Sequence, residues 1–153
     1  MGMVIMDIKI TEGFTPPQEV VNYAHTIVHQ NFTLNTPREF QKHVGDDALF
    51  KRHLSIWMEC EPSEIDYVFF SCPNGATPHR DELNLSEFEK YTFLMPIILP
   101  EGKVILKVNE SALDIQYLPL GVLIRFNHQH IHSLELENPG KCVMIMAAKL
   151  QSK

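Results

Sequence analysis

The sequence has few of the features that identify small secreted, membrane or zinc-finger proteins. It has only three cysteines, Cys60, Cys72 and Cys142, and no C-x-x-C spacing, so neither a disulfide framework nor a zinc knuckle is indicated. No apolar run approaches the ~20 residues that a membrane helix needs. Residues 1–10 lack the cationic start and the cleavage pattern of a secretory signal. We therefore expect a soluble, cytoplasmic domain with reduced thiols.

Positive charge is also scarce. The chain has 13 Lys and Arg against 19 Asp and Glu, which gives a formal net charge of −6. Broad binding to nucleic acid depends on cations that neutralise phosphates, so this balance disfavours nucleic-acid partners. With 153 residues, of which 44% are hydrophobic, the chain has the size of one compact domain with a real core. We expect residues 1–153 to form a single domain.

The hydrophobic pattern changes near residue 60. Before it, helical signals dominate. Thr15-Pro16-Pro17-Gln18 has the chemistry of a helix start with Thr15 as the N-cap, and an apolar stripe at helical spacing follows over residues 20–28. A second start at residues 36–39 and a short third helix over residues 47–54 are predicted in the same way. The sequence thus predicts a helical N-terminal layer over about residues 1–60.

From about residue 61 to 150 the pattern is typical of strands. Short segments rich in β-branched and aromatic residues are separated by turn signals such as Pro73-Asn74-Gly75. The predicted strands cover residues 65–72, 91–99, 104–108, 112–118, 121–127, 133–137 and 142–147. Short strands at near-regular spacing favour a sandwich or jelly roll, and the preceding helices are expected to cover one sheet face. The expected class is α+β, mainly β.

His79 and Asp81 form the first group with possible chemistry. In an extended segment, residues two apart point to the same side. An imidazole nitrogen and a carboxylate oxygen would then converge on one ion. The alternative is an exposed polar turn without a function of its own.

A second group, His128, His130 and His132, directly follows the apolar segment 121–126. If this segment stays extended, the three imidazoles share one face. Burying three imidazoles without partners is costly, and a metal supplies a partner, because histidine is the commonest metal ligand. The alternative is a solvated strand end whose histidines make ordinary hydrogen bonds.

Two histidines and one carboxylate on one face of a metal are the arrangement of non-haem Fe(II) oxygenases. The order of PHRDE, YTFLMPIILPEG, GVLIRFNHQHIHSLE and GKCVMIMAAKL resembles the 2-oxoglutarate- and Fe(II)-dependent dioxygenase family over about residues 65–150. The resemblance implies a double-stranded β-helix (jelly roll) in which His79, Asp81 and His132 hold Fe(II), with His130 as the fallback ligand. It also implies a reaction with O₂ that converts 2-oxoglutarate to succinate and CO₂ and hydroxylates an unidentified peptide or small molecule.

The same resemblance implies which residues bind the cosubstrate. Lys141, nine positions after His132, stands where the family places a basic residue for the far carboxylate of 2-oxoglutarate. Its ammonium would pair with that carboxylate as a point charge. Arg125 is the next candidate for this role. Three further positions resemble those that hydrogen-bond the cosubstrate: Tyr67, Tyr91 and Thr92.

Two other classes of protein remain open. His130 and His132, followed by Glu135, echo the metal motif of a cupin, which uses a similar barrel. A cupin normally has a second histidine-bearing motif, and no histidine follows His132 in this chain. The other class is a non-catalytic jelly-roll binding module in which the histidines are incidental.

Overall fold

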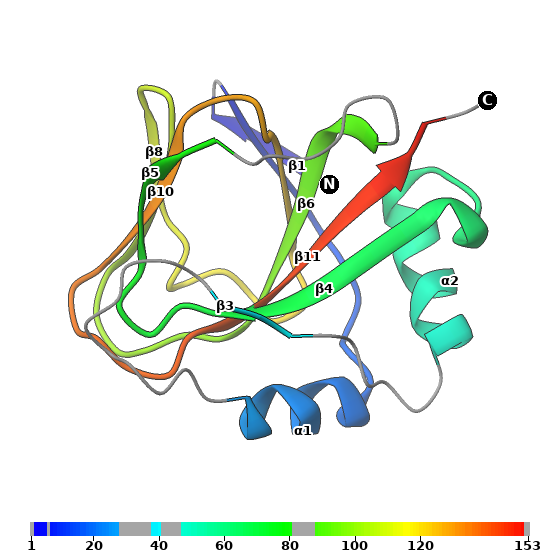
Figure 1. The fold of residues 1–153 in the computed structure, drawn as a ribbon, viewed down its shortest axis with the longest axis horizontal. Coiled ribbons are helices and arrows are strands. Elements are labelled where there is room, and N and C mark those ends of the chain that lie inside the picture. The colour runs from blue at the N-terminus through cyan, green and yellow to red at the C-terminus, as the bar shows by residue number, and fades with distance from the viewer. Residues whose placement is uncertain (1, 6, 28–37, 41–46, 81–87, 152–153) are drawn as a thin grey trace.

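The structure is a computed structural model that describes residues 2–5, 7–27, 38–40, 47–80 and 88–151 (Figure 1). Within these ranges the chain is mainly β, which confirms the coarse prediction of the fold class. No helix in the described part of the chain is long and apolar enough to span a membrane.

The helices lie in the first half of the chain, and most strands follow them. The helices are α1 (Gln18–Thr26), α2 (Asp47–Met58) and the short 3-10 helix η1 (Pro62–Glu64). The strands before residue 60 are β1 (Gly2–Ile5), β2 (Ile8–Thr11) and β3 (Arg38–Phe40). The strands after it are β4 (Ile65–Ser71), β5 (Ala76–His79), β6 (Phe88–Ile98), β7 (Val104–Val108), β8 (Ser111–Asp114), β9 (Leu123–Asn127), β10 (His132–Leu136) and β11 (Val143–Leu150).

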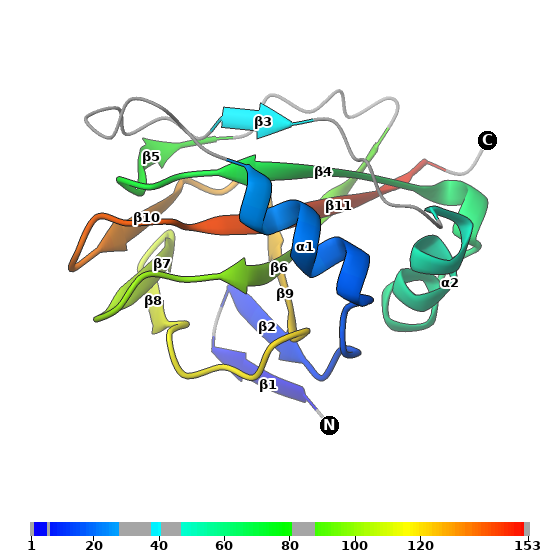
Figure 2. The same cartoon turned by 90° about the horizontal axis from the view of Figure 1, so that it is seen from below.

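The described strands form two antiparallel sheets. The large sheet has seven strands in the order β1-β2-β9-β6-β11-β4-β3, and the small sheet has four in the order β5-β10-β7-β8. From β4 onward the chain passes back and forth between the sheets, so β4, β6, β9 and β11 belong to the large sheet and β5, β7, β8 and β10 to the small one. The two views show the sheets facing each other, with both helices beside the large sheet (Figures 1 and 2).

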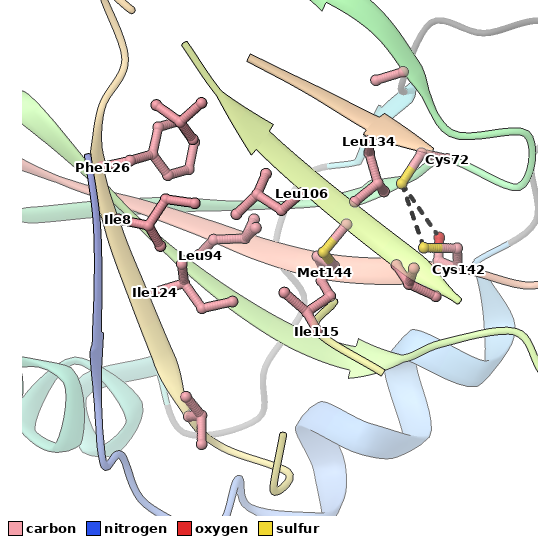
Figure 3. Close-up of a cluster of buried hydrophobic side chains, with 14 of the residues drawn as sticks. Ile8, Cys72, Leu94, Leu106, Ile115, Ile124, Phe126, Leu134, Cys142 and Met144 are labelled. Carbon is pink, nitrogen blue, oxygen red and sulfur yellow. Dashed lines mark hydrogen bonds between the residues drawn. The ribbon is translucent and has the colours of Figure 1, made fainter. Parts of the chain in front are cut away.

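The large sheet is apolar on both faces because each face has its own cover. Successive side chains of a strand point to opposite faces. Along β4, β6, β9 and β11 the even-numbered side chains pack between the sheets (Figure 3), as in Phe70, Leu94, Ile124, Phe126 and Met144. The odd-numbered ones pack under the helices with Val20 of α1 and Phe50 and Leu54 of α2, as in Tyr67, Phe69, Met95, Leu123 and Ile145. In the middle of these strands the parity of a residue number therefore tells which face its side chain occupies. The pattern breaks at the register irregularity near the end of β6, where Ile98 packs under the helices.

Most of the helices and strands were predicted correctly from local sequence signals, and a few were not. All seven predicted strands are present with ends shifted by a few residues, and helices occur at the first and third predicted places. The second predicted helix is wrong where it can be judged, because residues 38–40 form the strand β3, paired with β4. The sequence-based prediction also missed β1, β2 and β5. The N-cap of α1 is Pro17, without a side-chain cap, rather than Thr15.

The buried layer between the helices and the large sheet contributes to the stability of the fold. Phe69 is completely buried there, and its ring meets that of Tyr23 from α1 edge to face at 4.9 Å. We expect Phe69→Ala to lower the free energy of unfolding by about 3–5 kcal/mol, through lost burial and the cavity that remains. Urea denaturation measures this. Tyr117→Ala is the matched control, because Tyr117 is 85% exposed, and should change stability by less than about 0.5 kcal/mol; equal effects of the two substitutions would contradict the layered core.

Candidate metal centre

His79 and His132 lie side by side, although about a third of the chain separates them in sequence. They occupy neighbouring strands of the small sheet and are direct partners in the antiparallel register of β5 and β10. Their ring centroids are 4.4 Å apart, with the rings 60° from parallel. The structure thus brings together two of the three side chains predicted to hold a metal.

An irregularity in β5 produces this alignment. His132 is opposite His79, whereas Leu134, two residues further along β10, is opposite Ala76, three residues back along β5. The extra residue on β5 is a bulge, a device that changes which face later side chains occupy. Ala76 faces the space between the sheets, and strict alternation would turn His79 outward. Because of the bulge, His79 joins His132 on the inner side.

Hydrogen bonds to the backbone fix the orientation of both rings. Nδ1 of His79 lies 2.6 Å from the carbonyl oxygen of Thr77, and Nδ1 of His132 lies 2.9 Å from that of His130. A carbonyl only accepts hydrogen bonds, so Nδ1 carries the proton in both rings. In the neutral imidazole the lone pair is then on Nε2. This is the arrangement of histidines that bind metals, where the second nitrogen donates to a backbone carbonyl or carboxylate.

Both histidines line a cavity of about 170 Å³ between the two sheets. Apart from them, the lining is mostly apolar: Val68, Phe70, Cys72, Ala76, Leu94, Leu106, Phe126, Ser133, Leu134, Met144 and Met146. The ring of Phe126 is 4.8 Å from that of His132, and His132 is only 6% exposed. An engineered cavity of about 150 Å³ in another protein binds benzene, so this one has room for a small organic molecule next to the histidines.

The third predicted ligand, Asp81, lies outside the described residues. Within the described ranges, no three His, Cys, Asp or Glu side chains gather into a metal site. The chain leaving β5 is held close to the turn before β10, because Nε of Arg80 donates to the carbonyl oxygen of Gln129 at 3.0 Å. Asp81 is the next residue.

The other two histidines of the second group do not share a face with His132, so the prediction of an extended segment is wrong. The backbone turns between β9 and β10, where the amide of His130 donates to the carbonyl of Asn127. His128 is fully buried, with Nε2 at 3.2 Å from the carbonyl oxygen of Glu89. Nδ1 of His130 lies 3.8 Å from a carboxylate oxygen of Asp7. The structure places His132 beside His79, and it places His130, the fallback ligand, elsewhere.

Lys141 and Tyr67 are placed on the helix side of the large sheet, away from the cavity. Lys141 has the outer parity, just before β11, and its ammonium donates to the carbonyl of His25 in α1. Tyr67 is buried under the helices, with its ring 4.9 Å from that of Phe50. Neither residue lines the cavity that contains the histidines. The resemblance suggested these two residues by their order in the sequence, and sequence order does not fix which face of a strand a side chain occupies.

Tyr91 and Thr92 are neighbours on β6 that face opposite ways. The Tyr91 ring lies on the outer side, with the Arg125 guanidinium 4.4 Å from its centroid. Thr92 has the inner parity and is opposite Phe126 in the ladder. It is fully buried, and its hydroxyl has no hydrogen-bond partner among the described residues. Of the four predicted cosubstrate residues, Thr92 alone is on the inner face of its strand.

Glu135, the acidic residue of the cupin alternative, points out of the small sheet. Its carboxylate oxygens are both 3.1 Å from the ammonium of Lys107 on β7, and both side chains are about half exposed. It does not line the cavity. The geometry thus gives no support to a ligand set of the cupin type.

Cys72 and Cys142 face each other at the junction of β4 and β11 (Figure 3). Their sulfur atoms are 3.5 Å apart, and both residues are buried. The hydrogen bond with Cys142 raises the pKa of the Cys72 thiol well above its ordinary value, and burial raises it further. Only the thiolate is a strong nucleophile or metal ligand. Cys72 therefore contributes a neutral, inert surface to the cavity.

No protein-family model matches this chain, and no curated protein matches it. Conclusions on function consequently depend on the arrangement of the strands and on the geometry of the histidine pair.

The thiols should differ in reactivity. The pKa of Cys72 is raised, so its thiolate fraction is small at pH 8 and grows only as the pH approaches the raised value. We expect a disulfide reagent such as dithionitrobenzoate to label Cys60 of the native protein, which is partly exposed, and to label Cys72 and Cys142 only on unfolding. Cys60→Ser is the control and should abolish the native labelling. Rapid labelling of native Cys60→Ser would show that the buried pair is reactive.

Proposed function

We propose that this chain is an Fe(II)- and 2-oxoglutarate-dependent dioxygenase built on a double-stranded β-helix. The observation that carries the proposal is the pair His79 and His132, adjacent across β5 and β10, each with Nδ1 bonded to a backbone carbonyl. Two such imidazoles present their Nε2 lone pairs from one wall of a barrel interior. The substrate, a peptide or a small molecule, is not identified.

The strand order supports the proposed fold. The eight strands β4–β11 divide into two sets of four that face each other, and the chain crosses between them repeatedly. Double-sheet jelly rolls have eight strands in two such sheets. In this arrangement β5 and β10 are neighbours, so residues at the end of β5 and the start of β10 meet at one mouth of the barrel.

The residues fit iron. The open 2-His-1-carboxylate triad is the ligand set of non-haem Fe(II) oxygenases. His79 and His132 supply the two imidazoles, and Asp81, two positions after His79, is the carboxylate that the sequence predicts. The backbone hydrogen bonds to both Nδ1 atoms hold the rings in the orientation that such a site needs.

The residues fit 2-oxoglutarate less well than they fit iron. A cosubstrate with two carboxylates calls for a cation near its far end, and no Lys or Arg is among the described residues that line the cavity. Lys141 is bonded to the backbone of α1 instead. Thr92 does not line the cavity either, but it is opposite the cavity-lining Phe126 in the ladder, and its buried hydroxyl lies on the inner face of β6. We therefore propose that hydrogen bonds, rather than an ion pair with Lys141, hold the cosubstrate.

In this proposal the protein positions the reactants and excludes water. Bound Fe(II) supplies the activation of O₂ that couples decarboxylation of 2-oxoglutarate, giving succinate and CO₂, to hydroxylation of a C–H bond. His79 and His132 hold the metal at fixed orientation, with their Nδ1 protons retained by the carbonyls of Thr77 and His130. The apolar lining, including Phe126 beside His132, keeps the space next to the metal dry, which strengthens polar interactions there and suppresses side reactions.

No Lys or Arg is among the described residues that line the cavity, and this favours a second candidate function. The second candidate is a metal-binding module without oxygenase chemistry. Such a protein would use the same two histidines and leave the cavity for an uncharged ligand, which its mostly apolar lining would accept. The two candidates differ in turnover. An iron-loaded dioxygenase releases succinate from 2-oxoglutarate, whereas the module does not.

Substitution of the ligands tests the metal centre. We expect His79→Ala, His132→Ala and Asp81→Ala each to abolish stoichiometric Fe(II) binding and succinate formation, because removing one of three ligands leaves too few donors to retain the ion. Anaerobic calorimetry with Fe(II) and an assay of succinate are the measurements.

His25→Ala is the matched control, because His25 is exposed on α1 and should bind iron like the unmodified protein. Full iron binding by His79→Ala or His132→Ala would refute the centre. Iron binding by the unmodified protein without succinate formation, under reducing conditions, would select the metal-binding module.

The two cosubstrate hypotheses predict opposite results. We expect Thr92→Val to weaken 2-oxoglutarate binding about tenfold or more, the effect of losing a hydrogen bond to a charged group, and to leave stability unchanged or higher because an orphaned hydroxyl is removed. Lys141→Ala should leave 2-oxoglutarate binding unchanged, since its ammonium is bonded to His25. Calorimetry on the iron-loaded protein measures both. The reverse pattern would restore Lys141 as the carboxylate anchor.

A further inference from the structure

Three cations, Lys9, Lys90 and Arg125, line one cavity beside β2, β6 and β9 of the large sheet. Lys9 of β2 and Arg125 of β9 are directly opposite each other in the antiparallel register. Lys90 comes from the start of β6. The Tyr91 ring is close to two of them, with the Arg125 guanidinium 4.4 Å and the Lys90 ammonium 5.3 Å from its centroid. Cation–π contacts of this kind hold a guanidinium in place.

None of these three cations forms an ion pair with a carboxylate in the part of the chain that the structure describes. The ion pairs found there join Lys107 to Glu135, Lys149 to Glu89 and His130 to Asp7. Like charges directly opposite in a sheet are destabilising, and Lys9 and Arg125 are both half-buried. A cross-strand pair of cations without a carboxylate is thus a cost to the fold that a bound anion would remove.

The cations line a cavity that is large enough for a ligand. Its volume is about 320 Å³, and Lys9, Lys90, Tyr91, Arg125 and Asp7 contribute to its wall. Small-molecule sites usually measure about 300–1,000 Å³. The carboxylate of Asp7 has partners of its own, since one oxygen accepts from the Ser111 hydroxyl at 3.5 Å and the other is 3.8 Å from His130, which also lines the cavity. The wall of the cavity thus contains three cations that form no ion pair and one carboxylate that has partners in the protein.

We propose that this cavity, formed by Lys9, Lys90, Tyr91 and Arg125, binds the oxyanion group of a small molecule, a carboxylate or a phosphate. Both groups accept two parallel hydrogen bonds from a guanidinium, and the Tyr91 ring orients the guanidinium for them. Phe126 belongs to the lining of this cavity and of the cavity that contains the histidines. The two cavities therefore adjoin at Phe126.

Anion titration tests the site. The full-length chain, freed of metal by a chelator, is titrated with inorganic phosphate and separately with acetate, at an ionic strength held constant with chloride. Backbone amide NMR signals of Lys9, Tyr91 and Arg125 report binding. We expect saturable shifts with at least one anion, and a loss of affinity of about tenfold or more in Arg125→Gln. Saturation by phosphate alone assigns a phosphate-bearing ligand, by acetate alone a carboxylate, and by both a general oxyanion site.

Matched variants make the result decisive. Lys103→Gln removes an exposed lysine on the turn between β6 and β7, and should bind the anion as the unmodified chain does. Lys9→Gln provides a second test of the site if Arg125→Gln does not fold. Saturation by neither anion, or equal affinity in the unmodified chain and in a folded Arg125→Gln or Lys9→Gln variant, overturns the proposal. His79→Ala should keep the anion affinity, so failure of the iron centre and failure of this site are distinguishable.

Discussion

Burial of the large sheet on both faces is the constraint on which the rest of this structure depends. Helices cover one face and the small sheet covers the other, so β4, β6, β9 and β11 supply apolar side chains at even and odd positions alike. Polar side chains are then tolerated only near strand ends or where a partner exists. The buried Thr92, whose hydroxyl has no partner among the residues that the structure describes, is a departure from that rule on the inner face. Water, an ion or a ligand can supply the missing bond of such a buried group.

In the small sheet, the pairing of β5 with β10 places two imidazoles next to each other. Its strands are short, and β5 and β10 are paired although they are far apart in sequence. The bulge in β5 shifts the face of His79 by one residue relative to Ala76. Backbone carbonyls two residues earlier in each chain segment then hold both rings. Pairing, bulge and carbonyl anchors together produce a pre-oriented pair of nitrogen donors.

Local patterns were sufficient for the parts of the fold that depend on local chemistry. Strand segments with β-branched and aromatic residues were predictable, as was the helix over residues 47–58. The strand β3 was not, because Arg38-Glu39-Phe40 follows a typical helix start and becomes a strand only through pairing with β4. Tertiary pairing of this kind overrides propensity. The strand β5 was missed for a similar reason, since its four residues have no recognisable alternation.

The candidate site was predictable in identity but less so in orientation. His79 and His132 were identified from residue type and order, and the structure places them together. Lys141 was chosen by its distance from His132 along the chain, and distance along a chain does not fix the face of a strand. Its odd number places it with Val143 and Ile145 on the helix side. A shift by one residue moves the side chains of a strand to its other face. The register of β11 therefore determines that Lys141 lies on the helix side and not on the side of the cavity.

The long sequence separation between β5 and β10 has a consequence for the order of events during maturation. No hairpin of neighbouring strands contains both histidines, because β5 gains His132 as a neighbour only when β10 has been synthesised and inserted between β5 and β7. Pairings between distant segments form late, since the loop that joins them must close first. Any ion that needs both imidazoles must therefore be captured after β5 and β10 have paired, and a nascent chain that ends before residue 132 has no means of holding it.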